Sequence, residues 1–152
     1  MTALGQPVRI IVHHTVTAED ADPLDINRMH KAKFGGIGYH ALVYRAAGGD
    51  WVVGDGRDDE RLGAHTKGLN TGSLGVAIAG NYQYSPPSMG ALGMVIGQCL
   101  SWCLTYDIDP ANIYPHNAVG RTATVCPGMT PIDTIRAAVA AGIAAVRPTV
   151  HV

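Results

Sequence analysis

His13, His116 and Cys126 offer two imidazoles and one thiol, side chains that zinc takes as ligands in proteins. His13 closes an apolar run that begins at residue 8, whereas His116 and Cys126 stand ten residues apart. That spacing does not match structural zinc sites, which use closely spaced ligand pairs. Three protein ligands leave a fourth tetrahedral position for water, the arrangement of catalytic zinc. The residue types therefore predict a zinc-assisted hydrolase.

Only one histidine of the His13-His14 pair is expected to bind the metal, because successive side chains of a strand point to opposite faces. Two neutral imidazoles and one thiolate leave zinc with a net charge of about +1, which can lower the pKa of bound water from near 16 towards 7. The metal can also polarise a carbonyl and hold the oxyanion that forms on attack. Amide hydrolysis needs both functions.

The elements that would position these residues indicate an α/β fold. We expect strands at residues 8–14, 39–45, 51–53 and 74–79, and a short strand at 113–114 that delivers His116. Helices are expected at residues 22–33, 88–106 and 131–146, the last packing across the sheet. The glycine-rich stretch 54–73 is expected to be irregular and to carry binding residues. The sequence thus predicts a single domain, residues 1–152 with a core at about 8–146, containing a central mixed sheet of about five strands with helices on both faces.

Composition excludes several classes of protein. Hydrophobic residues make up 47% and charged residues 15% of the chain, which excludes a disordered chain or a coiled coil. The net charge of −1 gives no electrostatic footprint for nucleic acid or an anionic membrane. No apolar run is expected to reach the roughly 18–20 residues that span a bilayer, and the start lacks the features of a signal peptide. We expect a monomer that does not insert into membranes.

Other reactive side chains are expected to be structural. Three cysteines are too few for a disulfide framework, and Cys99 and Cys103 are expected to be small buried side chains of one helix. Residues 58–60 are expected to form an exposed acidic turn rather than an acid/base pair. His30 and His151 are expected to be solvated.

Five short motifs occur in order along the chain: IVHHT at 11–15, GYH at 38–40, GAHTKGLN at 63–70, SLGVAIAGNY at 73–82 and CPG at 126–128. Together they closely resemble the zinc-dependent N-acetylmuramoyl-L-alanine amidases of the peptidoglycan-recognition-protein type, a family that includes many phage endolysins. The resemblance runs from about residue 8 to 145 and implies the fold of that family.

The resemblance implies a role for each matching residue. His13, His116 and Cys126 match the zinc ligands. Tyr39 matches a tyrosine whose phenol can hydrogen-bond the zinc-bound water or the oxyanion. Thr124 stands where some members carry lysine and others threonine, so here the oxyanion donor would be neutral.

Four further residues have either a groove role or a structural one. His65 and Asn70 match the glycine-rich segment that lines it, where they either contact substrate or brace the loop. His14 is either a groove residue or a buried structural one. His40 is expected to be structural, because it follows Tyr39 on one strand and points the other way.

The implied reaction is hydrolysis of the amide that joins the lactyl group of N-acetylmuramic acid to L-alanine of the stem peptide, by zinc-activated water. The proton for the leaving amine would come from Tyr39 or from the attacking water. The partner would be bacterial peptidoglycan, in the cell wall. The chain would then be made in the host cytoplasm and released at lysis, as a phage endolysin is, or be a domain excised from a longer protein.

Two alternatives carry no catalysis. A peptidoglycan-binding module is the first, although members of that kind typically lack the metal cysteine. A zinc-stabilised interaction domain is the second. The chain also departs from the family beside the metal. Cys126 follows His116 by ten positions, whereas many relatives use a step of eight, and Asn117-Ala118 stands where Arg-Asp is expected.

Overall fold

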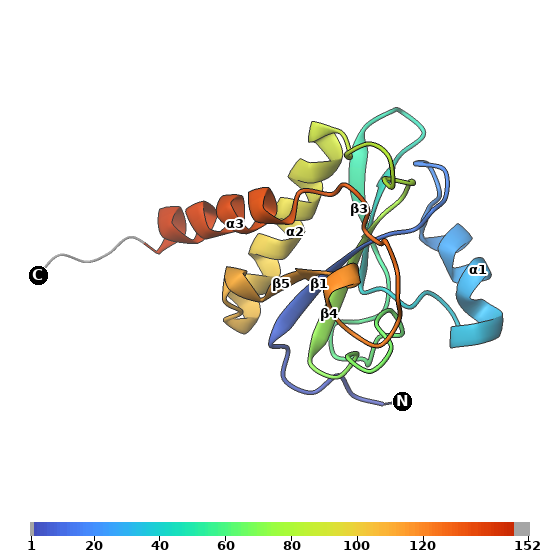
Figure 1. The fold of residues 1–152 in the computed structure, drawn as a ribbon, viewed down its shortest axis with the longest axis horizontal. Coiled ribbons are helices and arrows are strands. Elements are labelled where there is room, and N and C mark those ends of the chain that lie inside the picture. The colour runs from blue at the N-terminus through green and yellow to red at the C-terminus, as the bar shows by residue number, and fades with distance from the viewer. Residues whose placement is uncertain (1, 148–152) are drawn as a thin grey trace, which may run out of the picture.

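The computed structural model describes residues 2–147, which form a five-stranded mixed sheet with helices on both faces (Figure 1). The strands lie in the order β3-β2-β4-β1-β5. Their bounds are Arg9–His14 (β1), Ala41–Arg45 (β2), Trp51–Asp55 (β3), Ser73–Ile78 (β4) and Ile113–Pro115 (β5). The helices are Pro23–Phe34 (α1), Met89–Tyr106 (α2) and Ile132–Val146 (α3). The predicted α/β architecture is confirmed, and His151 lies outside the described residues.

Four strands run parallel, and this direction is what assembles the site. β1 pairs in parallel with β4 and β5, and β2 pairs in parallel with β4, whereas β3 is the antiparallel hairpin partner of β2. Every residue of β4 and all but the first of β1 are buried, as expected for interior strands of a parallel sheet. The carboxyl ends of the parallel strands meet at one edge, the usual location of a ligand site in such sheets.

Local sequence explains where α1 begins and ends. The Asp22 side chain accepts the N–H of Asp25, the Asp25 side chain accepts the N–H of Asp22, and Pro23 occupies the first turn. Gly35 ends the helix at φ 76°, a left-handed conformation that glycine adopts without strain. Ile26 then packs α1 against the sheet face that carries Leu42.

The other two helices lie on the opposite side of the sheet. α2 starts at the cap residue Ser88 and packs on the sheet through buried residues that include Val95, Cys99 and Cys103. α3 was expected to cross the sheet, but it packs mainly along α2 and contacts the sheet at edge strand β5 (Figure 1). The sheet beside it is already covered by the longer α2.

Two further expectations are wrong. α2 is long and apolar enough, by length and composition only, to cross a membrane, so a segment of that length does exist. Residues 58–60 are also not simply an exposed acidic turn, because Asp59 Oδ2 accepts hydrogen bonds from Trp102 Nε1 at 3.0 Å and from the Tyr106 hydroxyl at 3.1 Å. These two bonds tie the irregular loop after β3 to α2.

β2 begins at Ala41, two residues later than expected, and His40 precedes it as a buried structural residue. Its Nε2 lies 2.8 Å from the Arg61 carbonyl, and its Nδ1 accepts the N–H of Gly75 at 3.0 Å. Both partners are backbone groups, so His40 must carry its proton on Nε2. The prediction that His40 is structural agrees with these contacts.

Candidate metal centre

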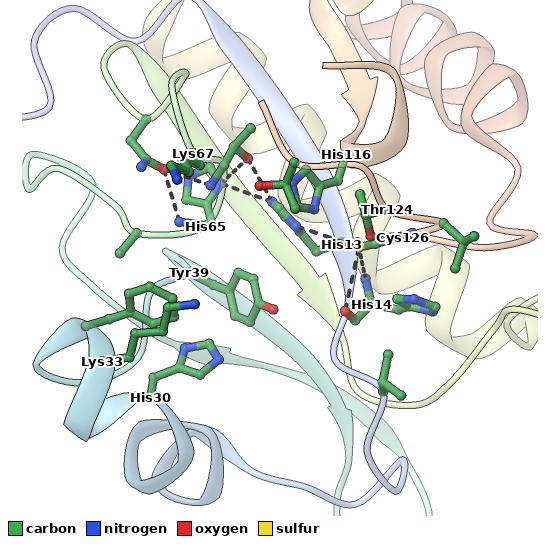
Figure 2. Close-up of a pocket in the computed structure, with 17 residues that line it drawn as sticks. His13, His14, His30, Lys33, Tyr39, His65, Lys67, His116, Thr124 and Cys126 are labelled. Carbon is green, nitrogen blue, oxygen red and sulfur yellow. Dashed lines mark hydrogen bonds between the residues drawn. The ribbon is translucent and has the colours of Figure 1, made fainter. Parts of the chain in front are cut away.

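The structure brings the three predicted ligands together at the carboxyl edge of the sheet (Figure 2). Val12 of β1 pairs with Pro115 of β5, so the residues that follow, His13 and His116, emerge side by side. Their ring centroids lie 4.6 Å apart, and Cys126 Sγ lies 3.8 Å from His13 Nδ1. One ligand atom of each residue lies within 4.8 Å of the others, so the group could hold a metal ion.

Backbone hydrogen bonds hold Cys126 in this position. The N–H of His14 donates to Cys126 Sγ at 3.2 Å, and the N–H of Asn117 donates to the Cys126 carbonyl at 2.7 Å. The N–H of Cys126 in turn donates to Thr124 Oγ1 at 3.1 Å. The Thr124 hydroxyl accepts this bond through a lone pair, so it can still donate its hydrogen.

The chemistry of the donor atoms fits a metal. Among the described residues, His116 Nε2 is buried without a hydrogen-bond partner, which costs about 1–3 kcal/mol unless another group satisfies it. Burial raises the pKa of the Cys126 thiol to about 11, so the thiolate needs a nearby cation. Burial, and then His65 and His116, hold the pKa of His13 well below its usual value, which keeps the ring neutral as a ligand must be.

His65 and Asn70 lie beside this group. The His65 ring is 9% exposed and stands edge-on to His13, with His65 Nδ1 3.0 Å from His13 Nε2. Asn70 Oδ1 accepts the backbone N–H groups of His65 at 3.0 Å and of Thr66 at 2.9 Å. Asn70 therefore braces the loop, and substrate contact by either residue stays a prediction.

His14 points away from the ligands, as strand alternation requires. Its Nδ1 accepts the backbone N–H of Tyr82 at 3.0 Å, and the side chain is buried. This contact agrees with the structural alternative for His14. The residue also borders the pocket, and a role in substrate binding stays a prediction.

The metal-ligand group lies in a cavity of about 670 Å³, a volume typical of small-molecule sites. The Tyr39 ring centroid lies 5.2 Å from that of His13, and the hydroxyl points toward the ligands (Figure 2). Burial, and then Cys126, raise the pKa of Tyr39 well above its usual value, so the phenol keeps its proton and can donate a hydrogen bond. The lining also includes His30, Lys33, His65, Lys67, Asn70, His116, Thr124 and Val125.

His30 is a pocket residue that sequence reasoning missed, and the expectation that it is solvated is wrong. It is half-buried, and its ring centroid lies 5.3 Å from that of Tyr39. Its Nδ1 accepts the N–H of Gly38 at 3.1 Å, so a neutral ring carries its proton on Nε2. Helical spacing could have indicated this position, because His30 follows buried Ile26 by four residues and so lies on the same face of α1.

The charges around the cavity are positive. The exposed residues Lys33 and Lys67 border it, and Lys33 Nζ lies 5.1 Å from the centroid of the Phe34 ring. Within residues 2–147, no aspartate or glutamate lines the cavity. General acid chemistry by a carboxylate therefore has no candidate among these lining residues.

Comparison with known proteins gives one family. The family of N-acetylmuramoyl-L-alanine amidases matches residues 4–129. A peptidoglycan-recognition protein of Drosophila melanogaster is 31% identical over 149 residues, covering 90% of this chain and 77% of that protein. Peptidoglycan-recognition protein SD of Drosophila simulans is 34% identical over 93 residues, covering 55% of this chain, and the match spans only about half of that protein (48%).

The fold comparison agrees. The solved structure of the endolysin N-acetylmuramoyl-L-alanine amidase LysCS from Clostridium intestinale superposes with a TM-score of 0.77 at 27% identity, covering 88% of this chain and 84% of that one. The predicted fold resemblance is confirmed.

Proposed function

The chain belongs to the N-acetylmuramoyl-L-alanine amidase family, and we propose that it hydrolyses the amide between N-acetylmuramic acid and L-alanine of the peptidoglycan stem peptide. The observation that carries this proposal is the convergence of His13, His116 and Cys126 within 4.8 Å, in a cavity that also holds the Tyr39 hydroxyl. The buried His116 Nε2, which has no hydrogen-bond partner among the described residues, lies beside a thiol, and this supports a metal site over a module that only binds peptidoglycan.

His13, His116 and Cys126 would hold one zinc ion, whose ligand preferences they match. When bound, the ion would supply a Lewis acid for the carbonyl and lower the pKa of water. The protein contributes the neutral state of both imidazoles, because their burial disfavours protonation. It also places the cysteine sulfur on the ligand cluster through the His14 N–H.

Tyr39 and Thr124 would stabilise the oxygen that gains negative charge during attack. The Tyr39 phenol keeps its proton, and the Thr124 hydroxyl, which accepts the Cys126 N–H, can still donate its own hydrogen. Removing one such donor typically costs about 10²–10³ in rate. Because no carboxylate lines the described cavity, the proton for the leaving amine would come from Tyr39 or from the attacking water, and Lys33 and Lys67 at the cavity border are further side-chain donors.

We assign the chain to cell-wall degradation of the endolysin kind, supported by its likeness to the endolysin LysCS. The test is mass spectrometry of purified peptidoglycan incubated with the protein, with a chelator, and with the chelator followed by added zinc. Release of stem peptides with a free N-terminal L-alanine, lost with the chelator and restored by zinc, is the expected result. Binding to peptidoglycan without any release would instead identify a recognition module.

A further inference from the structure

We propose that His65 is a positioning residue that fixes the tautomer of His13 and so selects the His13 nitrogen that faces the metal. The inference rests on the metal centre of the proposed function. It assigns to His65 an action through His13 rather than a contact with substrate.

The Ser73 carbonyl, which can only accept a hydrogen bond, determines the tautomer of His65. His65 Nε2 lies 3.3 Å from the Ser73 carbonyl oxygen, and both atoms are buried. A carbonyl offers no proton, so His65 must carry its own proton on Nε2. A neutral imidazole has one N–H, and His65 Nδ1 is therefore an acceptor.

The acceptor nitrogen of His65 determines the tautomer of His13. His13 Nε2 lies 3.0 Å from His65 Nδ1, and two bare nitrogens at that distance would repel each other. His13 must therefore carry its proton on Nε2 and donate it. Thr66 Oγ1, 2.9 Å from His65 Nδ1 and 3.4 Å from His13 Nε2, joins this network without changing the outcome. His13 Nδ1 is left with its lone pair on the side of Cys126 Sγ, 3.8 Å away.

The sheet fixes the positions of the groups in this hydrogen-bond chain from Ser73 through His65 to His13. Ser73 is the first residue of β4, which pairs with β1, so its carbonyl is fixed relative to His13 by the strand ladder. The His65 ring fits because two glycines leave it room: a Cβ on Gly75 would lie 2.7 Å from ring atoms of His65, and one on Gly63 would lie 2.5 Å away. Neither glycine has a positive φ, so close approach of the ring is what excludes a side chain there.

The burial of His65 argues against direct substrate contact. The side chain is 9% exposed, and each ring nitrogen already has a partner within the protein. Orientation of a ligating histidine by a hydrogen bond to its other nitrogen typically changes metal affinity by about 10–100-fold.

The test compares zinc dissociation constants of the zinc-free proteins by competition with a chromogenic chelator. His65→Phe keeps a flat ring but removes the acceptor, and zinc binding should weaken by about 10–100-fold. His65→Gln keeps an amide oxygen that can accept and an amide N–H that can donate, and should restore part of that loss. Gly75→Ala should weaken binding by displacing the ring, whereas the control Gly97→Ala, with no atom within 4 Å, should not.

A second measurement needs no variant. Long-range ¹⁵N–¹H correlation spectra of the unmodified zinc-free protein should show His13 and His65 each protonated on Nε2 and bare on Nδ1. A proton on His13 Nδ1, or His65→Phe binding zinc as tightly as the unmodified protein, would overturn the inference. If zinc binding and both tautomers are as described but no stem peptides are released, the proposed amidase function is wrong and the role of His65 is still supported.

Discussion

Asn117 donates its backbone N–H to the carbonyl of Cys126 at 2.7 Å, which ties the residue after one predicted ligand to the other ligand. This bond holds the two ends of the intervening segment together. Its middle packs elsewhere, because the N–H of Arg121 donates to the Lys67 carbonyl at 2.9 Å. The segment between the two predicted ligands is thus anchored on the loop that carries His65.

Replacing the predicted sulfur ligand should abolish turnover. Cys126→Ser substitutes a hydroxyl, a much poorer zinc ligand than thiolate, and leaves nearly the same volume. We expect no stem-peptide release and loss of bound zinc by elemental analysis, with a far-ultraviolet circular dichroism spectrum close to that of the unmodified protein. Substantial amidase activity in this variant would refute the ligand assignment.

Removing the Tyr39 hydroxyl should slow the chemical step. Tyr39→Phe keeps the ring against His13 but deletes the proposed hydrogen-bond donor, so kcat should fall about 10²–10³-fold with little change in KM or zinc content. Tyr84→Phe is the matched control, because Tyr84 is 84% exposed. An unchanged kcat in Tyr39→Phe would remove the phenol from the mechanism.

Relieving the backbone strain at Val16 should raise the free energy of unfolding and weaken substrate binding. Val16 adopts φ 57°, an outlier for a β-branched residue, while its side chain is largely exposed and borders the cavity. Val16→Gly should raise the free energy of unfolding by about 1 kcal/mol, because relief of about 1–3 kcal/mol of strain exceeds the entropic cost of glycine. The same change should raise KM, as measured with soluble muropeptides.

The comparison for this prediction is Asp107→Gly. Asp107 has φ 55° at the end of α2, but aspartate tolerates that conformation, so stability should change less than in Val16→Gly. KM should not change, since Asp107 is absent from the described pocket lining. A Val16→Gly protein that is less stable than the unmodified one would contradict the strain argument.

The zinc-free protein should lose stability as the pH falls below about 6.5, the usual pKa of histidine in an unfolded chain. Burial is the largest cause that holds the pKa of His40 below that value, and its Nδ1 already accepts the Gly75 N–H. The unfolded state therefore binds more protons below about pH 6.5, and stability present above that pH is lost as the pH falls through the folded pKa. Each such histidine contributes up to about 1.4 kcal/mol per pH unit.

Urea denaturation at several pH values checks this. His40→Asn keeps an acceptor near Gly75 and removes the titrating group, so the variant should be less stable at pH 8 but show a flatter decline between pH 6.5 and 5. An equally steep decline in His40→Asn would assign the pH dependence to other groups.

Sequence patterns predicted those parts of the site that depend on local rules. Alternation along a strand separated His13 from His14, and the structure turns the two rings to different partners. The helix expected at residues 22–33 agrees with α1 to within a residue at each end, because Asp22 caps its start and Gly35 ends it. These features follow from neighbours in the chain.

What the sequence did not predict depends on contacts between distant segments. His30 was expected to be solvated, but the packing of α1 beside Tyr39 brings it into the pocket lining. Asp59 was expected in an exposed turn, yet it bonds to residues more than forty positions away on α2. The mutual arrangement of His13 and His65 likewise arises only once β1 and β4 are paired.

The short length of β5 has a consequence for assembly. With three residues, this edge strand gains little from its own ladder, and it pairs with β1 alone. A metal bound by His13 at the end of β1 and by His116 just after β5 would hold these two strands in a single pairing register. Metal binding would then require that β5 has paired with β1. An incompletely folded chain would therefore lack the proposed amidase activity.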